Sequence, residues 1–483
     1  MPKPLKKRSM IGTFTRPVLV LLGLLLLLSC KEQARHPNII LILTDQQSES
    51  MMSSSGNQYL HTPAMDYIAN NGIRFTRAYV TNPVCSPSRV SLMTGRFPGF
   101  YKDAEGRQVR NNAGAMDIPA NSPEASGDNL ASYLTNAGYD LVYGGKQHLP
   151  AFLDPDLVGF HVLTEDARGE LASKAADYIR ADHDKPYFMA VSLINPHDIC
   201  FMAIRDFADS TYQQQLQRNF KTELTLLDKA LELPGGVSRE EFFEQYCPPL
   251  PPNFEPQEDE AKAIELFLDR DPRSFRSGAR EEYTEEQWRM HRWAYARLTE
   301  MADAHVQEIL DALIESGKEE ETLILFTSEH GDNDGSHRLE HKNVLYEESV
   351  KVPFTAMWKG HIPAGQVNDR QLVSVGLDLL PTLADYAGIT AETDPRGSSL
   401  RPLFEGEKVD WRESLGIEGE ISRAVIQEGG IKYIRYDAAG FEERLMDLKE
   451  DPYETTHFTH DPAYKEQLEK IRIEFEEYWF EGH

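Results

Sequence analysis

The chain has 483 residues, of which 78 are acidic and 50 basic, so its formal net charge at pH 7 is −28. The length suffices for a large α/β domain and a smaller one, and 40% hydrophobic and 27% charged residues are ordinary for a soluble globular protein. The negative charge argues against nucleic acid or an anionic membrane surface as a partner. Any binding of an anion therefore requires a local cluster of basic side chains.

The first 29 residues have the features of an export signal. Five basic residues precede an apolar run, residues 18–28, that is too short to span a bilayer. The run leads into LLSC, which resembles a bacterial lipobox with Cys30 as the lipidated residue. We expect an exported protein that meets a membrane only through a lipid anchor at Cys30, facing the periplasm or the cell surface. A plain signal peptide with an incidental cysteine is the alternative.

Four apolar runs, residues 38–43, 139–143, 187–194 and 322–326, are each followed at once by polar residues. Continuous aliphatic runs of this kind are typical of parallel strands that are covered on both faces. The polar segments that follow them are TDQ (44–46), GGKQH (144–148), NPH (195–197) and TSEHG (327–331). Because active sites gather at the carboxyl ends of such strands, we expect the four polar segments to converge.

Two helices are predicted near the first strand. Thr62 and Pro63 fit the N-cap and first position of a helix over residues 64–71, which Gly72 ends. A second helix is expected to open just after Cys85. That thiol would then lie beside amide N–H groups at the positive end of the helix dipole.

The middle of the chain is richer in helices. Residues 201–290 form an acidic excursion that contains a proline-rich connector, and a long helix is predicted over residues 285–316. We expect the three large aromatic residues of that helix to belong to the core. They are Trp288, Trp293 and Tyr295.

The C-terminal part predicts a small antiparallel sheet. Residues 423–427 and 431–436 are strand-like and flank a Gly-Gly turn, as in a β-hairpin, and an amphipathic helix over 464–478 closes the chain. Cys200 and Cys247 lie in no zinc-binding pattern, and the sequence leaves open whether they pair.

Several motifs together resemble one enzyme family. They are CSPSR (85–89, the pattern C-x-P-x-R), VSLMTGR (90–96), YEESVKVP (346–353), DLLPT (378–382), and MDL with DPYE (446–454). From about residue 37 to the C-terminus, the chain resembles the type I, formylglycine-dependent sulfatases of the alkaline phosphatase superfamily. This resemblance implies an α/β fold with a large mixed, mostly parallel sheet sandwiched by helices, and a smaller C-terminal α+β subdomain built on a short antiparallel sheet.

The resemblance also implies the nucleophile. Cys85 would be oxidised to 3-oxoalanine (formylglycine) by a formylglycine-generating or sulfatase-maturating enzyme. One hydroxyl of the hydrated aldehyde would attack sulfur in line and displace the alcohol, and the second would then lose its proton and expel sulfate. A serine or an unmodified cysteine would be left as a stable sulfate ester, so the second hydroxyl matters.

One Ca²⁺ ion per chain is implied as well. The ligands that carry over from the family are Asp45, Gln46, Cys85 as formylglycine, Glu329 and His330. Gln46 and Glu329 both stand where the family usually has aspartate, so this site has two protein carboxylates. Calcium prefers oxygen ligands and histidine is a softer ligand than it normally takes, so Mg²⁺ or mixed occupancy stays open.

Five side chains would handle the sulfate. Arg89 would hold the formylglycine diol, and His148 would be the base that takes the diol proton. Lys146 and Lys342 would clamp the sulfate oxygens as point charges. His197, protonated near neutral pH beside an anion, would donate a proton to the leaving alcohol.

The expected organisation is a catalytic domain over residues 37–365 and a C-terminal subdomain over residues 366–483. Arg110, His337 and Arg338 lie near the motifs and are the candidates for contacts to the rest of the substrate. The two arginines would suit a carboxylated or multiply sulfated sugar.

The sequence therefore predicts a calcium-dependent sulfatase that acts on carbohydrates. Export and family together favour oligosaccharides from a sulfated polysaccharide, such as an algal polymer or a glycosaminoglycan. One alternative is a phosphonate monoester or phosphodiester hydrolase of the same superfamily. Another is a non-catalytic protein that binds sulfated glycans.

Overall fold

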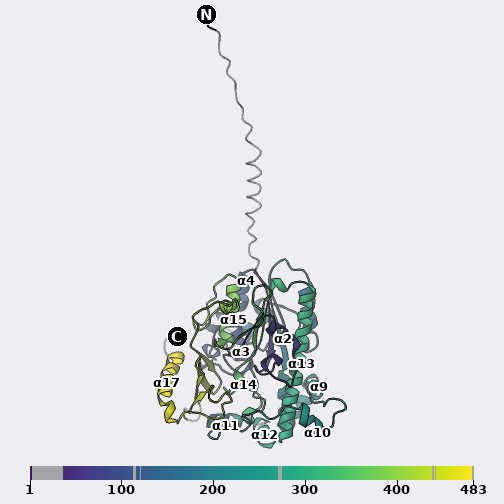
Figure 1. Ribbon diagram of the computed structural model, residues 1–483, viewed down its shortest axis with the longest axis vertical. Coiled ribbons are helices and arrows are strands. Elements are labelled where there is room, and N and C mark those ends of the chain that lie inside the picture. Colours follow the sequence, from purple (N-terminus) through teal and green to yellow (C-terminus); the bar gives the residue numbers. More distant parts are fainter. Residues whose placement is uncertain are drawn as a thin grey trace. The chain divides into compact units, whose positions relative to one another are not determined.

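The computed structural model describes residues 1–2, 36–112, 116–119, 121–269, 275–437, 440 and 442–480 (Figure 1). Residues Pro37–His483 form one unit with its own core. The predicted signal peptide over residues 1–29 and its Cys30 lie outside the described residues, apart from the first two positions. In the described part of the chain, every helix is too short or too polar to cross a membrane.

An eight-stranded sheet with the strand order β5-β4-β6-β1-β7-β8-β2-β9 lies at the centre of this unit. The strands are β1 (Asn38–Asp45), β2 (Ile73–Phe75), β4 (Asp140–Gly145), β5 (His161–Val162), β6 (Tyr187–Pro196), β7 (Thr322–Ser328), β8 (Phe354–Met357) and β9 (Gln366–Asn368). The five from β5 to β7 are parallel, whereas β8 runs antiparallel to both of its neighbours. The predicted mixed, mostly parallel sheet is confirmed, and all four apolar runs are strands within it.

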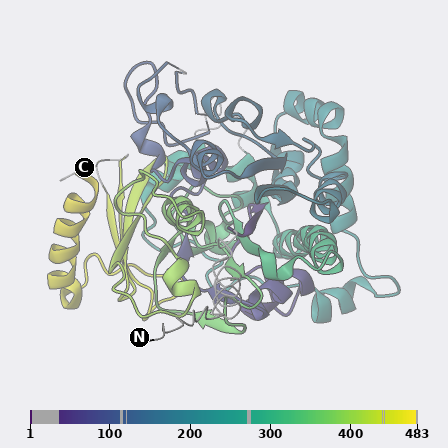
Figure 2. The ribbon, with the colours of Figure 1, turned by 90° about the horizontal axis from the view of Figure 1, so that it is seen from above.

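Helices cover both faces of this sheet (Figure 2). In β1, Ile39 and Leu41 face one core cluster, whereas Ile40 and Ile42 face the other. Successive side chains point to opposite faces of the strand, and both faces are buried. This stretch of the strand is therefore apolar at every position rather than at every second one. The first cluster includes α3 (Cys85–Thr94), α4 (Leu130–Asn136) and α15 (Val375–Tyr386), and the second includes α2 (Pro63–Asn70), α6 (Leu171–Arg180) and α13 (Glu285–Glu315).

Helix α2 begins and ends one residue earlier than predicted and has a different cap. Thr62 makes no capping hydrogen bond, and its hydroxyl instead accepts from the Ser53 N–H at 2.9 Å. The carboxylate of Asp303 in α13 accepts from the N–H groups of Ala64 at 3.2 Å and Met65 at 2.8 Å. A side chain from a packed neighbour has thus replaced the local cap.

The excursion packs around the N-terminal half of α13. Its helices include α7 (Phe201–Phe207), α8 (Ser210–Asn219), α9 (Lys221–Ala230), α10 (Arg239–Glu241), α11 (Lys262–Asp269) and α12 (Phe275–Glu282). Trp288, Trp293 and Tyr295 are all buried, which confirms their assignment to the core. The remaining short elements are α5 (Pro155–Val158), α14 (Glu347–Val350), α16 (Arg401–Phe404), β3 (Ala78–Tyr79) and β10 (Val373–Ser374).

The C-terminal sheet is antiparallel and contains the predicted hairpin. Its strands are β11 (Ser414–Glu418), β12 (Ser422–Gln427), β13 (Ile431–Tyr436) and β14 (Glu443–Asp447). Helix α17 (Lys465–Phe480) covers one face of the sheet, as its yellow ribbon shows in Figures 1 and 2. The other face joins the main core, and the boundary proposed between residues 365 and 366 stays a prediction.

A buried ion pair anchors the start of α15 and gives a test of its packing. Asp378 is fully buried and accepts two hydrogen bonds from Arg412, at 2.5 and 2.6 Å. Arg412→Ala leaves this carboxylate without its charge partner, so we expect the free energy of unfolding to fall by about 3 kcal/mol. The control Arg401→Ala removes a side chain that is 40% exposed, and we expect it to cost less than about 1 kcal/mol. Urea unfolding measures both variants, and an equal loss of unfolding free energy in Arg412→Ala and Arg401→Ala would contradict the anchoring role of the buried pair.

Candidate active site

The strand register brings the four polar segments together. Thr44 and Ser328 are partners in the β1–β7 pairing, so Asp45 and Glu329 leave adjacent strands at the same edge of the sheet. The backbone N–H of Glu329 donates to the carbonyl of Thr44 at 3.1 Å. On the other side of β1, Asp45 is paired with Pro196, which places His197 beside it.

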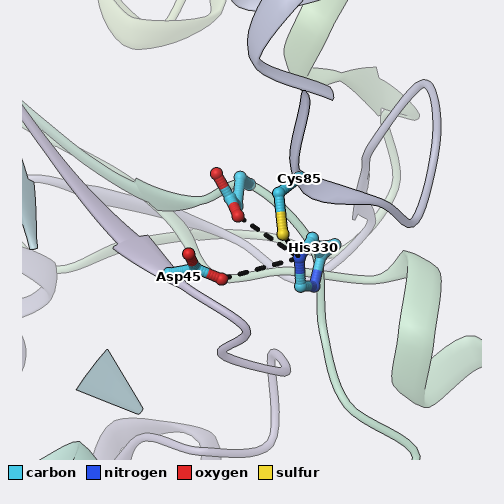
Figure 3. Close-up of side chains that lie close together, drawn as sticks. Asp45, Cys85 and His330 are labelled. Atoms are coloured by element: carbon cyan, nitrogen blue, oxygen red, sulfur yellow. Dashed lines mark hydrogen bonds and ion pairs between the residues drawn. The ribbon is translucent and has the colours of Figure 1, made fainter. Parts of the chain in front are cut away.

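Four side chains form a donor cluster at this edge, namely Asp45, Cys85, Glu329 and His330. Their ligand atoms lie within 4.8 Å of one another, and all four residues are buried. His330 Nε2 is 3.3 Å from Cys85 Sγ, 3.3 Å from Glu329 Oε1 and 3.6 Å from Asp45 Oδ1. In Figure 3 the Asp45 carboxylate and the Cys85 thiol both point toward the His330 ring.

The donor cluster fits a divalent cation. Asp45 Oδ1 and Glu329 Oε1 are buried and accept no hydrogen bond from the described residues. Ionised oxygens are costly to bury without a compensating partner. Oxygen donors of this kind are those that Ca²⁺ and Mg²⁺ prefer.

Gln46 lies next to the cluster but is held by other partners. Its Oε1 accepts from Lys342 Nζ at 2.8 Å, and its Nε2 donates to Asp332 Oδ2 at 2.6 Å. Its backbone has a φ of +70°, an uncommon conformation for a residue with a side chain. The role of Gln46 as a metal ligand stays a prediction.

Two ammonium groups dominate the electrostatics at Cys85. Lys342 Nζ lies 3.1 Å from Cys85 Sγ, and Lys146 Nζ forms an ion pair with Asp45. Burial alone would raise the pKa of the Cys85 thiol, but Lys146 and Lys342 outweigh it and hold this pKa well below its usual value. The position of the Cys85 side chain therefore favours negative charge.

Arg89 lies one turn into α3 and ties the site together. Its Nε pairs with Glu329, and its Nη1 donates to Ser192 Oγ at 2.7 Å and to the Lys146 carbonyl at 3.0 Å. The guanidinium thereby links α3 to β6 and to the segment after β4. Its proposed contact with a formylglycine diol stays a prediction.

The two histidines differ in their surroundings. Burial, followed by the nearby charge of Lys146, lowers the pKa of His197 well below its usual value, so the free protein holds this imidazole neutral. The expectation that His197 is protonated beside a bound anion stays a prediction. The His148 carbonyl accepts from Ser86 Oγ at 2.7 Å, which places His148 beside the first turn of α3.

Amide groups at the start of α3 contribute less than expected. Asn112 Oδ1 accepts from the Ser86 N–H at 2.9 Å, and Pro87 has no N–H to offer. The largest charges that lower the pKa of the Cys85 thiol are those of Lys146 and Lys342. The sequence reasoning did not assign Asn112, Ser192 or Asp332, although Ser192 is conspicuous as a hydroxyl within an apolar run and Asp332 follows the last motif directly.

The candidate substrate residues make contacts outside the donor cluster. Arg110 pairs with Asp437 at 2.5 Å, and Arg338 pairs with Glu255 at 2.8 Å. His337 is fully buried and stacks on Tyr346, with ring centroids 3.9 Å apart. Their contact with substrate stays a prediction. Cys85, Cys200 and Cys247 are free, buried thiols, so Cys200 and Cys247 do not pair.

Comparison with known proteins agrees with this geometry. The family described as Sulfatase matches residues 37–389, and the family described as N-sulphoglucosamine sulphohydrolase, C-terminal, matches residues 335–479. The Delta 4,5-hexuronate-2-O-sulfatase of Bacteroides thetaiotaomicron is 25% identical over 487 residues, which cover 95% of this chain and 92% of that protein.

Solved structures show the same fold. A 2-O GAG sulfatase is 25% identical, with a TM-score of 0.72 and 92% of each chain covered. The phosphonate monoester hydrolase of Agrobacterium radiobacter is 21% identical, with a TM-score of 0.67 over 91% of this chain and 94% of that one, which is a likeness of fold alone. The Sulfatase match spans the whole donor cluster and the basic side chains around it. This chain therefore belongs to the sulfatase family of the alkaline phosphatase superfamily and is a sulfuric ester hydrolase.

Proposed function

We propose that this sulfatase removes sulfate from oligosaccharides derived from a sulfated polysaccharide, such as a glycosaminoglycan or an algal polymer. The observation that carries the proposal is the position of Cys85, which belongs to the buried donor cluster and lies beside two ammonium groups. The names of two relatives, a hexuronate-2-O-sulfatase and a 2-O GAG sulfatase, support an anionic sugar as the substrate.

We further infer that a maturating enzyme converts Cys85 to formylglycine, and that Asp45, Glu329 and His330 bind Ca²⁺. The C-x-P-x-R pattern supports the first inference, and the two buried carboxylates support the second. When bound, the cation would supply positive charge that polarises the sulfate and favours an ionised nucleophile.

The protein's own side chains would then divide the remaining work. Lys146 and Lys342 would hold the sulfate oxygens on the side of Cys85, where Lys342 already lies 3.1 Å from the sulfur. His148 would take a proton from the nucleophile. The pKa of His197 is low in the free protein, and the charge of a bound sulfate ester would raise it. His197 would therefore gain a proton only when substrate is bound, and would then donate it to the leaving alcohol.

We also propose that the enzyme is exported and lipid-anchored to a bacterial membrane through Cys30. The basic start, the short apolar run and the LLSC sequence support this. The acidic composition is consistent with attachment by a lipid rather than by contact with anionic headgroups.

Sulfate release from a panel of defined sulfated oligosaccharides, measured by ion chromatography, tests the proposed function. Phosphate and phosphonate esters of matched alcohols are assayed on the same preparation. We expect release from one class of sulfated sugar, at a higher kcat/KM than for any phosphorus ester. The reverse ranking would support the phosphonate monoester or phosphodiester hydrolase alternative.

Removal of one donor tests the metal. Asp45→Asn deletes a charged oxygen from a cluster that has only two carboxylates, so we expect the Kd for Ca²⁺ to rise at least about tenfold. Thermal shift measured during a Ca²⁺ titration reports this without any substrate. The control Glu340→Gln replaces a buried acid outside the donor cluster and should leave the titration unchanged. Wild-type Ca²⁺ affinity in Asp45→Asn would contradict the assignment.

A further inference from the structure

The two lysines of the site have different partners. Lys146 pairs with the carboxylate of Asp45, which partly cancels its charge. Lys342 is 9% exposed and has no carboxylate partner within 4.0 Å among the described residues; its ammonium donates to the neutral Gln46 Oε1 at 2.8 Å. A neutral acceptor orients an ammonium group without cancelling its charge. Lys342 is therefore held in place by a neutral acceptor, with its charge directed at the position of Cys85, 3.1 Å away.

The orientation of the Gln46 amide depends on Asp332. Gln46 Nε2 donates to Asp332 Oδ2 at 2.6 Å, and the other carboxylate oxygen, Oδ1, accepts from the backbone N–H of Asp334 at 2.7 Å. Both oxygens of Asp332 thus receive a donor. Because the Lys342 ammonium can only donate, the oxygen of the Gln46 amide faces Lys342 and its nitrogen faces Asp332.

We propose that Asp332 and Gln46 form a positioning relay that holds Lys342 beside Cys85 without pairing its charge with a carboxylate. The inference rests on the proposed function, in which Lys342 binds the sulfate. A carboxylate at position 46, where the resembled family usually has aspartate, would form an ion pair with Lys342. In this protein the negative charge lies instead on Asp332, which contacts Gln46 and is separated from Lys342 by the Gln46 amide.

Asp332→Asn is the informative variant because it keeps the shape and removes one acceptor. The asparagine has a single oxygen for two donors, the Asp334 N–H and Gln46 Nε2. If the backbone N–H takes that oxygen, the new amide NH₂ faces Gln46 and reverses the Gln46 amide. A donor then faces the Lys342 ammonium, and the ammonium is displaced.

A double-mutant cycle tests whether Asp332 acts through Lys342. The Kd for inorganic sulfate is measured by calorimetry at saturating Ca²⁺ for wild type, Asp332→Asn, Lys342→Met and the double variant. We expect Asp332→Asn to raise the Kd about tenfold, and the double variant to match Lys342→Met within about twofold. The matched control Asp334→Asn alters a buried carboxylate of the same loop that does not contact Gln46, and should stay within about twofold of wild type.

Four results would overturn the relay, and three of them concern sulfate binding alone. They are additive losses in the double variant, an unchanged sulfate Kd in Asp332→Asn, and a wild-type protein that binds no sulfate. A loss of Ca²⁺ affinity without a loss of sulfate affinity would also overturn it, because Gln46 would then act on the metal. Hydrolysis of sulfated sugars is assayed in parallel, so that the relay and the proposed substrate are tested separately. Turnover without coupling between Asp332 and Lys342 would contradict only the relay. Coupling without turnover would contradict only the proposed substrate.

Discussion

Cys85→Ser is expected to abolish turnover, with kcat falling on the order of 10⁴-fold or more. A serine hydroxyl can attack sulfur once, but the sulfate ester that it forms has no second hydroxyl to expel the sulfate. The enzyme should therefore stop after one cycle. Steady-state sulfate release measures the loss, and mass spectrometry of the intact variant should show an unoxidised residue carrying one sulfuryl group.

The matched control for this variant is Cys247→Ser. Cys247 is also a free, buried thiol, but it donates to the carbonyl of Arg289 and lies outside the donor cluster. We expect its kcat to stay at the wild-type level. Repeated turnover by Cys85→Ser, with its side chain verified as unoxidised, would remove the basis of the nucleophile assignment.

His197→Ala is expected to have an effect that depends on the leaving group. Sugar hydroxyls are poor leaving groups, so loss of the proton donor should lower kcat by about 10²–10⁴-fold on a sulfated sugar. An aryl sulfate with an acidic phenol needs little protonation, and kcat on it should fall less than about tenfold. Comparing kcat on these two substrates isolates the proton-donor role, because a mere loss of structure would lower both equally.

His183→Ala provides the comparison for this experiment. His183 precedes the first residue of β6, whereas His197 follows its last residue, so the two histidines lie at opposite edges of the sheet. The ring of His183 stacks on Tyr178, with centroids 4.3 Å apart. We expect wild-type kcat on both substrates. An equal loss on sugar and aryl sulfates in His197→Ala would argue for a role in binding rather than in protonation.

The main sheet and part of the site could be predicted because their signals are local. Continuous apolar runs specify β1 and β7, since both faces of each strand are covered by helices. Residues that follow such strands must share an edge, which explains why Asp45 and Glu329 were expected together before any geometry was known. Cys85 was identified by its motif.

The contacts that could not be predicted join distant parts of the chain. Gln46 and Asp332 are 286 residues apart, and Asp303 caps α2 across 239 residues. Each of these polar groups has several partners that would satisfy it equally well, so the packing of the elements decides which one it finds. The lowered pKa of His197 has the same origin, because both its desolvation and the nearby charge of Lys146 depend on how the elements pack.

Helix α3 is buried along its whole length, and Cys85 itself is 1% exposed. A second protein cannot enclose this side chain in an active site of its own while α3 stays packed against α15 and the sheet. The maturating enzyme proposed above would therefore have to meet Cys85 in an extended segment, before the domain closes or during its transient opening. The proposed oxidation would thus compete with folding, because a chain that folds first would expose Cys85 only as often as α3 opens.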